Sequence, residues 1–156
     1  MMNARRTTIS FAAVLLAAMT LSSIAEAQSR GFDQPLLLTT SGELAEGYGA
    51  NVFAVFGTRV VTPPPTADLL PGITRDTLIQ YLRTQADLTI AEESVRPDDL
   101  AGADEVFLCG TGLEIVPLAS LDGRPFGDPA MPVMTRVSRW YRGIVDGTAD
   151  APAGWR

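Results

Sequence analysis

The segment LLPGITRDTLIQYLRTQ predicts a helix whose first turn could bind an anion. Pro71 and Gly72 form a turn, and Thr74 is the expected N-cap with Asp76 in the first helical turn. Free backbone N–H groups and the helix dipole favour a phosphate at such a terminus, and the Thr74 hydroxyl could add a donor. An ordinary capped helix that binds nothing explains the same residues.

A second candidate anion site is the segment CGTGLE, which follows an apolar strand. Gly110 and Gly112 flank Thr111, and glycine at these places permits close approach of a ligand to the backbone. The Thr111 hydroxyl could donate to that ligand. A β-bulge or a tight turn is the alternative explanation of the two glycines.

The carboxylate of Glu46 is the third candidate, because AEGYGAN places it at the end of a strand beside glycines. Solvent exposure is the default for glutamate. The functional interpretation is an acid held in a pocket, where it pairs with a cationic ring nitrogen. The adjacent pairs Glu92–Glu93 and Asp98–Asp99 are expected on the solvated surface, and Cys109 is expected to be a small buried apolar residue.

The composition excludes several other kinds of chemistry. A net charge of −6 argues against a nucleic-acid binder. One cysteine excludes an internal disulfide, and the lack of histidine removes the commonest metal ligand, so no metal site is expected. All 12 basic residues are arginines, and therefore no side-chain amine is present to form a Schiff base.

The first 27 residues have the layout of a secretory signal peptide. Arg5 and Arg6 form a basic region, residues 9–19 are almost entirely apolar, and Ala25-Glu26-Ala27 predicts cleavage before Gln28. An Ala/Leu-rich helix of the folded domain is the alternative. The sequence thus divides into residues 1–27 and a domain over residues 28–156, and both export and a cytoplasmic location remain open.

The remaining elements indicate a mixed α/β or α+β domain. Two hairpins are expected, with turns at Ser41-Gly42 and at Gly57. A strand is expected in LTIAEESV, a short acidic helix or turn in PDDLAGA, and two or more strands in DEVFLCGTGLEIVPLASLDGRPFG. The segment MPVMTRVSRWYRGIVDG predicts a closing helix, whose apolar side includes Val137, Trp140, Tyr141 and Val145.

Several segments together resemble the C-terminal part of class IV aminotransferases dependent on pyridoxal phosphate, and the branched-chain amino-acid aminotransferases most. The resemblance covers about residues 26–147 and is carried by AEGYGANVFAV, LLPGITRDTLI, ADEVFLCGTGLEIVPL, DGRPFGD and WYRGIVDG. It implies the C-terminal domain of that fold, with an antiparallel-rich sheet or pseudo-barrel and flanking helices.

The resemblance also implies a role for each candidate in binding pyridoxal phosphate without a covalent bond. Glu46 would lie against the pyridine nitrogen, and Leu70 would pack on the ring. Ile73, Thr74 and Thr111 would contact the phosphate.

The turn formed by Thr111, Gly112 and Leu113 would lie near the carboxylate of the substrate, an amino acid or 2-oxo acid. The reaction that the resemblance implies is transamination of branched-chain amino acids with 2-oxoglutarate. Family members are usually dimers, so a homodimer is one expected assembly.

The sequence departs from the family pattern at its catalytic group. The family's Schiff-base lysine, in a motif resembling K-x-x-G-N-Y, would fall at Ala12 and the motif's tyrosine at Ala17; Ala50 stands where many members carry glutamate. No counterpart of the family's N-terminal domain precedes the match. We therefore expect a truncated unit that does not catalyse transamination alone. The alternatives are an exported, inactive binding module and a subunit completed by a lysine-bearing partner.

Overall fold

The computed structural model describes residues 21–151, and the chain divides into two compact units, Met1–Pro35 and Leu36–Arg156. In the first unit residues 21–29 are helical, so the predicted cleavage site falls inside a helix. The basic and apolar parts of the predicted leader, residues 5–19, lie outside the described residues. Within the described part of the chain, no helix has the length and apolar character needed to cross a membrane.

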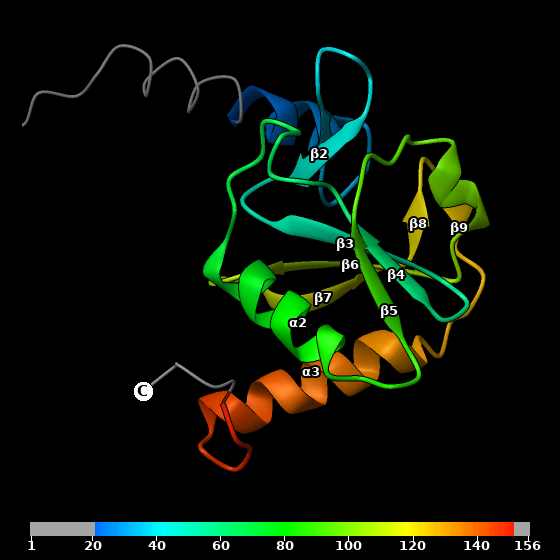
Figure 1. The fold of residues 1–156 in the computed structure, drawn as a ribbon. Helices are drawn as coiled ribbons and strands as arrows, with labels where there is room; N and C mark the ends of the chain where they lie inside the picture. The colour runs from blue at the N-terminus through cyan, green and yellow to red at the C-terminus, as the bar shows by residue number, and fades with distance from the viewer. Residues whose placement is uncertain (1–20, 152–156) are drawn as a thin grey trace, which may run out of the picture. The chain divides into compact units, whose positions relative to one another are not determined.

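The second unit is built on a five-stranded sheet with the strand order β5-β4-β3-β6-β7 (Figure 1). Strands β4 and β5 are parallel, and the other neighbours in this sheet are antiparallel. The mixed fold with a mostly antiparallel sheet, predicted from the sequence, is therefore confirmed. The strands of this sheet are β3 (Asn51–Phe56), β4 (Arg59–Thr62), β5 (Thr89–Glu92), β6 (Glu105–Gly110) and β7 (Glu114–Leu118).

Two short hairpins and three helical segments complete the described part of this unit. Helix α2 provides the crossover between the parallel strands β4 and β5. The elements are β1 (Leu36–Leu38) with β2 (Leu44–Gly47), β8 (Ser120–Leu121) with β9 (Arg124–Pro125), α2 (Ile73–Arg83), the 3-10 helix η1 (Asp99–Gly102) and α3 (Pro132–Val145).

Both predicted hairpins are present, and a glycine turns each of them. Gly42 lies in the β1–β2 connection with φ +81°, and Gly57 lies in the β3–β4 turn with φ +60°. These left-handed conformations cost little only without a Cβ, which is why the sequence signals at these positions were informative.

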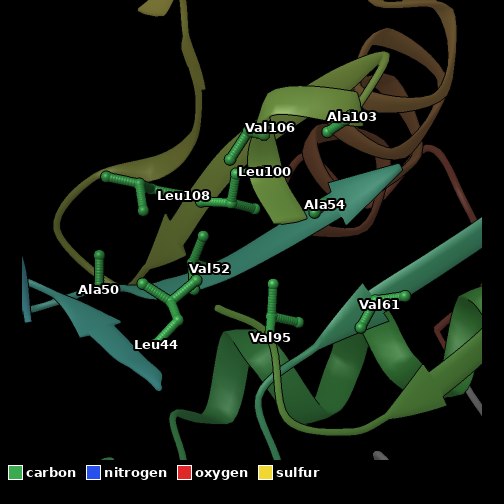
Figure 2. Close-up of a cluster of buried hydrophobic side chains, with 10 residues drawn as sticks. All are labelled: Leu44, Ala50, Val52, Ala54, Val61, Val95, Leu100, Ala103, Val106 and Leu108. Carbon is green, nitrogen blue, oxygen red and sulfur yellow. The ribbon is translucent and has the colours of Figure 1, made fainter. Parts of the chain in front are cut away.

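Alternate residues of the central strands face two separate apolar clusters. On one face, the buried cluster in Figure 2 combines residues of the sheet with Leu44 of β2, with Val95 of the segment after β5, and with Leu100 of η1. On the other face, Phe53 and Phe107 stack across β3 and β6 with ring centroids 5.3 Å apart. Helices α2 and α3 cover this second face.

Helices α2 and α3 are joined by an aromatic stack. The rings of Tyr81 and Trp140 lie 3.9 Å apart between centroids, and Val137 is fully buried beneath them in the cluster. Val145 was predicted on the apolar side of α3, but it is 66% exposed because the helix ends there. The buried stripe of α3 is thus shorter than the sequence pattern predicted.

Glu92 is exposed as predicted, but its carboxylate forms an ion pair that the sequence did not reveal. Its carboxylate accepts a hydrogen bond from the buried guanidinium of Arg75 at 2.9 Å and from Arg83 at 3.1 Å. Arg75 also donates to the Pro63 carbonyl at 2.8 Å. This ion pair connects the start of α2 with β5 and with the loop after β4. The neighbouring Glu93 forms an ion pair with Arg59, and Asp98 and Asp99 are exposed as predicted.

Candidate functional site

The strand topology brings the ends of several strands to one edge of the large sheet. Strand β4 runs toward this edge and ends at Thr62, whereas the antiparallel β3 starts there at Asn51. Strand β6 is antiparallel to β3 and pairs Cys109 with Asn51, so Gly110 also lies at this edge. Helix α2 starts from the loop that leaves β4. Helix N-termini beyond the carboxyl ends of strands are common anion sites in sheets with such crossovers.

Glu46 reaches this edge from the β1–β2 hairpin. It pairs with Leu37 across the hairpin, and its Oε2 accepts a hydrogen bond from the Leu70 N–H at 3.0 Å. Leu70 precedes α2 by three residues, and its side chain is 77% exposed. The structure therefore brings the predicted carboxylate next to the predicted ring-packing leucine, with the leucine side chain free of the core.

The predicted N-cap of the helix is corrected by the structure. Helix α2 begins at Ile73 with Gly72 as its N-cap, so Thr74 is the second helical residue. Thr74 is buried, and its Oγ1 lies 3.5 Å from the Tyr141 hydroxyl of α3. Gly72 has no side chain with which to cap the first turn. The backbone N–H groups at the helix start are consequently the donors that this terminus can offer to an anion.

The Thr111–Leu113 turn joins β6 to β7. Thr111 and Gly112 are exposed, whereas Leu113 is half-buried and packs against the apolar cluster of Figure 2. A Cβ on Gly110 would lie 3.0 Å from the Gly49 carbonyl oxygen. The close approach at Gly110 is therefore to the chain's own backbone, and it packs the end of β6 against the turn that follows Glu46.

Ile73 is 78% exposed at the start of α2. One hollow of the described surface lies along α3 and another beside the β8–β9 hairpin, and none of the predicted site residues lines either of them. Two groups of opposite charge lie close together at the site. The α2 terminus carries the positive end of the helix dipole, and the Glu46 carboxylate is half-buried nearby. Burial raises the pKa of Glu46 above its ordinary value of 4.5, and the hydrogen bond from Leu70 opposes this effect.

This raised pKa predicts how the Glu46→Gln variant responds to pH. Because the folded chain binds the proton of Glu46 more tightly than the unfolded chain does, stability falls as pH rises from about 4.5 through the raised pKa. Glutamine accepts the Leu70 hydrogen bond without ionising. We therefore expect the free energy of unfolding of Glu46→Gln, relative to that of the wild type, to be greater at about pH 7 than at about pH 4. Urea unfolding of both proteins at these two pH values measures the difference. A gain of the same size in Glu43→Gln, from the same hairpin, would contradict this expectation.

Comparison with known families shows which family the chain belongs to. A family model described as "Amino-transferase class IV" matches residues 17–121. The chain belongs to the class IV aminotransferase family. The probable branched-chain-amino-acid aminotransferase of Aquifex aeolicus is 33% identical over 131 residues, which are 83% of this chain and 42% of that protein. This class IV chain thus spans about two fifths of the length of the curated relatives that it matches.

Solved class IV structures share its fold. The branched-chain amino acid aminotransferase from Escherichia coli has a TM-score of 0.80 at 35% identity, covering 87% of this chain and 46% of that one. The enzyme from Thermobaculum terrenum, solved in its PLP form, has a TM-score of 0.83 at 34% identity, covering 94% of this chain and 48% of that one. The predicted family resemblance and fold are confirmed.

Sequence reasoning overlooked one residue that lies beside these candidate residues. Asn51 is 4% exposed, and its side chain forms hydrogen bonds with the loop that leads into α2. Its signal was a polar residue at the start of the apolar run NVFAVF, where an inward-facing position normally holds an apolar side chain.

Proposed function

We propose that this chain forms the ring-nitrogen and phosphate contacts of a pyridoxal phosphate site of the branched-chain aminotransferase type. The observation that carries this proposal is the hydrogen bond from the Leu70 N–H to Glu46 at 3.0 Å, three residues before the start of α2. This hydrogen bond holds the half-buried Glu46 carboxylate close to the N-terminus of α2. The N-cap of that helix is Gly72, so no N-cap side chain covers its first N–H groups.

The residues present fit the two charged ends of this cofactor. Its phosphate matches the N–H groups of Ile73 and Thr74 at the α2 terminus, together with the exposed Thr111 hydroxyl. Its protonated ring nitrogen matches the Glu46 carboxylate, and the exposed Leu70 side chain is available to pack on the ring. When bound, pyridoxal phosphate supplies the electron sink for transamination. Glu46 would favour the protonated ring, and thereby the stronger electron sink.

The proposed substrates are branched-chain amino acids and 2-oxo acids such as 2-oxoglutarate. The names of the relatives support this class. Thr111 and Gly112 are exposed in the β6–β7 turn, where a hydroxyl and a backbone N–H can meet a substrate carboxylate. Leu113 would act by fixing the turn, since its side chain packs against the apolar cluster.

We further propose that these 156 residues do not catalyse transamination by themselves, because they contain no lysine. In this chemistry a lysine would supply the amine that holds the cofactor and the base that moves the substrate proton. An amine from outside these residues would have to supply both functions, either in a lysine-bearing partner or in another part of an assembly. No side chain of these residues could therefore hold the cofactor covalently.

The proposal predicts a phosphate-dependent affinity for pyridoxamine 5′-phosphate, which has no aldehyde and so cannot react with the chain's terminal amine. We expect the chain to bind it about tenfold or more tightly than pyridoxamine, which lacks the phosphate, in calorimetric titrations. Thr111→Val should weaken pyridoxamine phosphate about three- to tenfold and leave pyridoxamine unchanged.

The matched control is Thr58→Val, because Thr58 is an exposed turn residue at the opposite end of β3. Its affinity for pyridoxamine phosphate should equal that of the wild type. Equal affinities of the wild type for the phosphorylated and unphosphorylated ligands would refute the phosphate site.

A further inference from the structure

The buried side chain of Asn51 holds the loop before α2 from two directions. Its Nδ2 donates to the Leu70 carbonyl at 2.9 Å, and its Oδ1 accepts from the Gly72 N–H at 3.1 Å. Pro71, between these two residues, has no N–H to offer. One side chain from the start of β3 therefore fixes both ends of the Leu70–Gly72 segment.

These contacts form a continuous path from Glu46 to the start of α2. The Glu46 carboxylate accepts from the Leu70 N–H, and the Leu70 carbonyl accepts from Asn51. Asn51 in turn accepts from Gly72, whose next residue, Ile73, begins the helix. Three hydrogen bonds thus connect the carboxylate with the helix terminus.

The glycine at position 72 is explained by the same contact. An added Cβ would lie 2.6 Å from the Asn51 Oδ1, closer than real Cβ contacts allow. Asn51 is 4% exposed and bonded at both amide atoms, so its side chain cannot move aside without breaking those bonds. The close fit shows that the position of Asn51 and the position of the helix N-cap are set together.

We propose that Asn51 is a positioning residue that fixes the separation between the Glu46 carboxylate and the N-terminus of α2. This inference rests on the proposed function, in which one ligand contacts both groups. A ligand that spans two sites gains affinity from both only if their separation matches its own length. Inorganic phosphate needs only the phosphate contacts at the α2 terminus and Thr111, and its binding does not depend on the separation from Glu46.

The test compares two probes on the Asn51→Ala variant. We expect its affinity for pyridoxamine 5′-phosphate to fall about tenfold or more, whereas its affinity for inorganic phosphate, followed by ³¹P NMR, changes about threefold or less. Amide hydrogen exchange at Leu70 and Gly72 should accelerate in the same variant. A general loss of structure would weaken both probes alike.

Thr62→Val is the matched control, because the Thr62 hydroxyl is also buried at this edge but donates to the Val52 carbonyl at 2.8 Å, whereas Asn51 bonds to Leu70 and Gly72. It should lower stability but keep the ratio of the two affinities. The inference fails if the wild type binds pyridoxamine phosphate and Asn51→Ala binds it equally well, or if Thr62→Val changes the ratio as much. If the wild type binds no pyridoxamine phosphate, the proposed function fails, and the inference falls with it.

Gly72→Ala tests the same contact from the loop and remains available if Asn51→Ala does not fold. The added Cβ would clash with the Asn51 Oδ1, although Asn51 itself is not replaced in this variant. We expect the same selective loss of pyridoxamine phosphate affinity. The loss should be smaller in the Asn51→Ala/Gly72→Ala double variant than the sum of the two single losses, and strict additivity would contradict a direct contact.

Discussion

Replacing Glu105 by alanine is expected to lower the free energy of unfolding by about 3 kcal/mol. Glu105 lies on β6 and is 1% exposed. Its Oε1 accepts from the Val133 N–H at 2.9 Å and its Oε2 from the Met134 N–H at 2.8 Å, both in the first turn of α3. The variant would leave two N–H groups without acceptors and remove a negative charge from the positive end of the helix dipole.

The start of α3 has no local substitute for this carboxylate. The N-cap residue is Met131, which adopts a left-handed conformation with φ +42° and makes no side-chain cap. Pro132 has no N–H. The distant Glu105 therefore caps α3 and attaches it to the sheet, and through the Tyr81–Trp140 stack it supports α2 as well.

Urea unfolding followed by far-UV circular dichroism measures this effect. The neighbouring Asp104→Ala provides the comparison, because the Asp104 carboxylate also accepts a backbone N–H, that of Gly57 at 2.6 Å, but in an exposed turn. We expect it to cost about 1 kcal/mol or less. Equal costs for the two variants would show that burial at Glu105 adds nothing.

The elements that were predicted well are those encoded by local signals. The turn glycines Gly42 and Gly57 and the alternating apolar residues around them fixed both hairpins, because a left-handed turn and a period of two are properties of short segments. The buried state of Cys109 followed from its place in an apolar strand, and burial raises the pKa of its thiol to about 12.

The features that were missed depend on contacts between distant segments. Thr74 was predicted as the N-cap because threonine favours that position, but the loop is held by Asn51, 21 residues before Gly72. The ion pair between Glu92 and Arg75 was also not predicted, because the two residues belong to different elements. A sequence without an alignment shows neither contact, since both form only when α2 crosses from β4 to β5.

The candidate site itself came from family motifs more than from local physics. Taken singly, an uncapped helix terminus, a glycine-flanked threonine and a lone glutamate each have ordinary structural explanations. The fold brings the first and the last together through Leu70, while the glycine at 110 serves the packing of the chain. The topology places Thr111 at the same edge of the sheet.

A titration with pyridoxamine 5′-phosphate on the wild type and on Glu46→Ala tests the central claim most directly. A half-buried carboxylate that pairs with a protonated ring nitrogen makes a charge-assisted hydrogen bond, so Glu46→Ala is expected to weaken binding about 10- to 100-fold. Glu43→Ala makes the same change of charge in the same hairpin and should bind like the wild type. Saturable binding that is lost in Glu46→Ala and kept in Glu43→Ala is the predicted result. Binding that is equal in all three proteins, or absent from the wild type, would contradict the assignment of this edge of the sheet as a cofactor site.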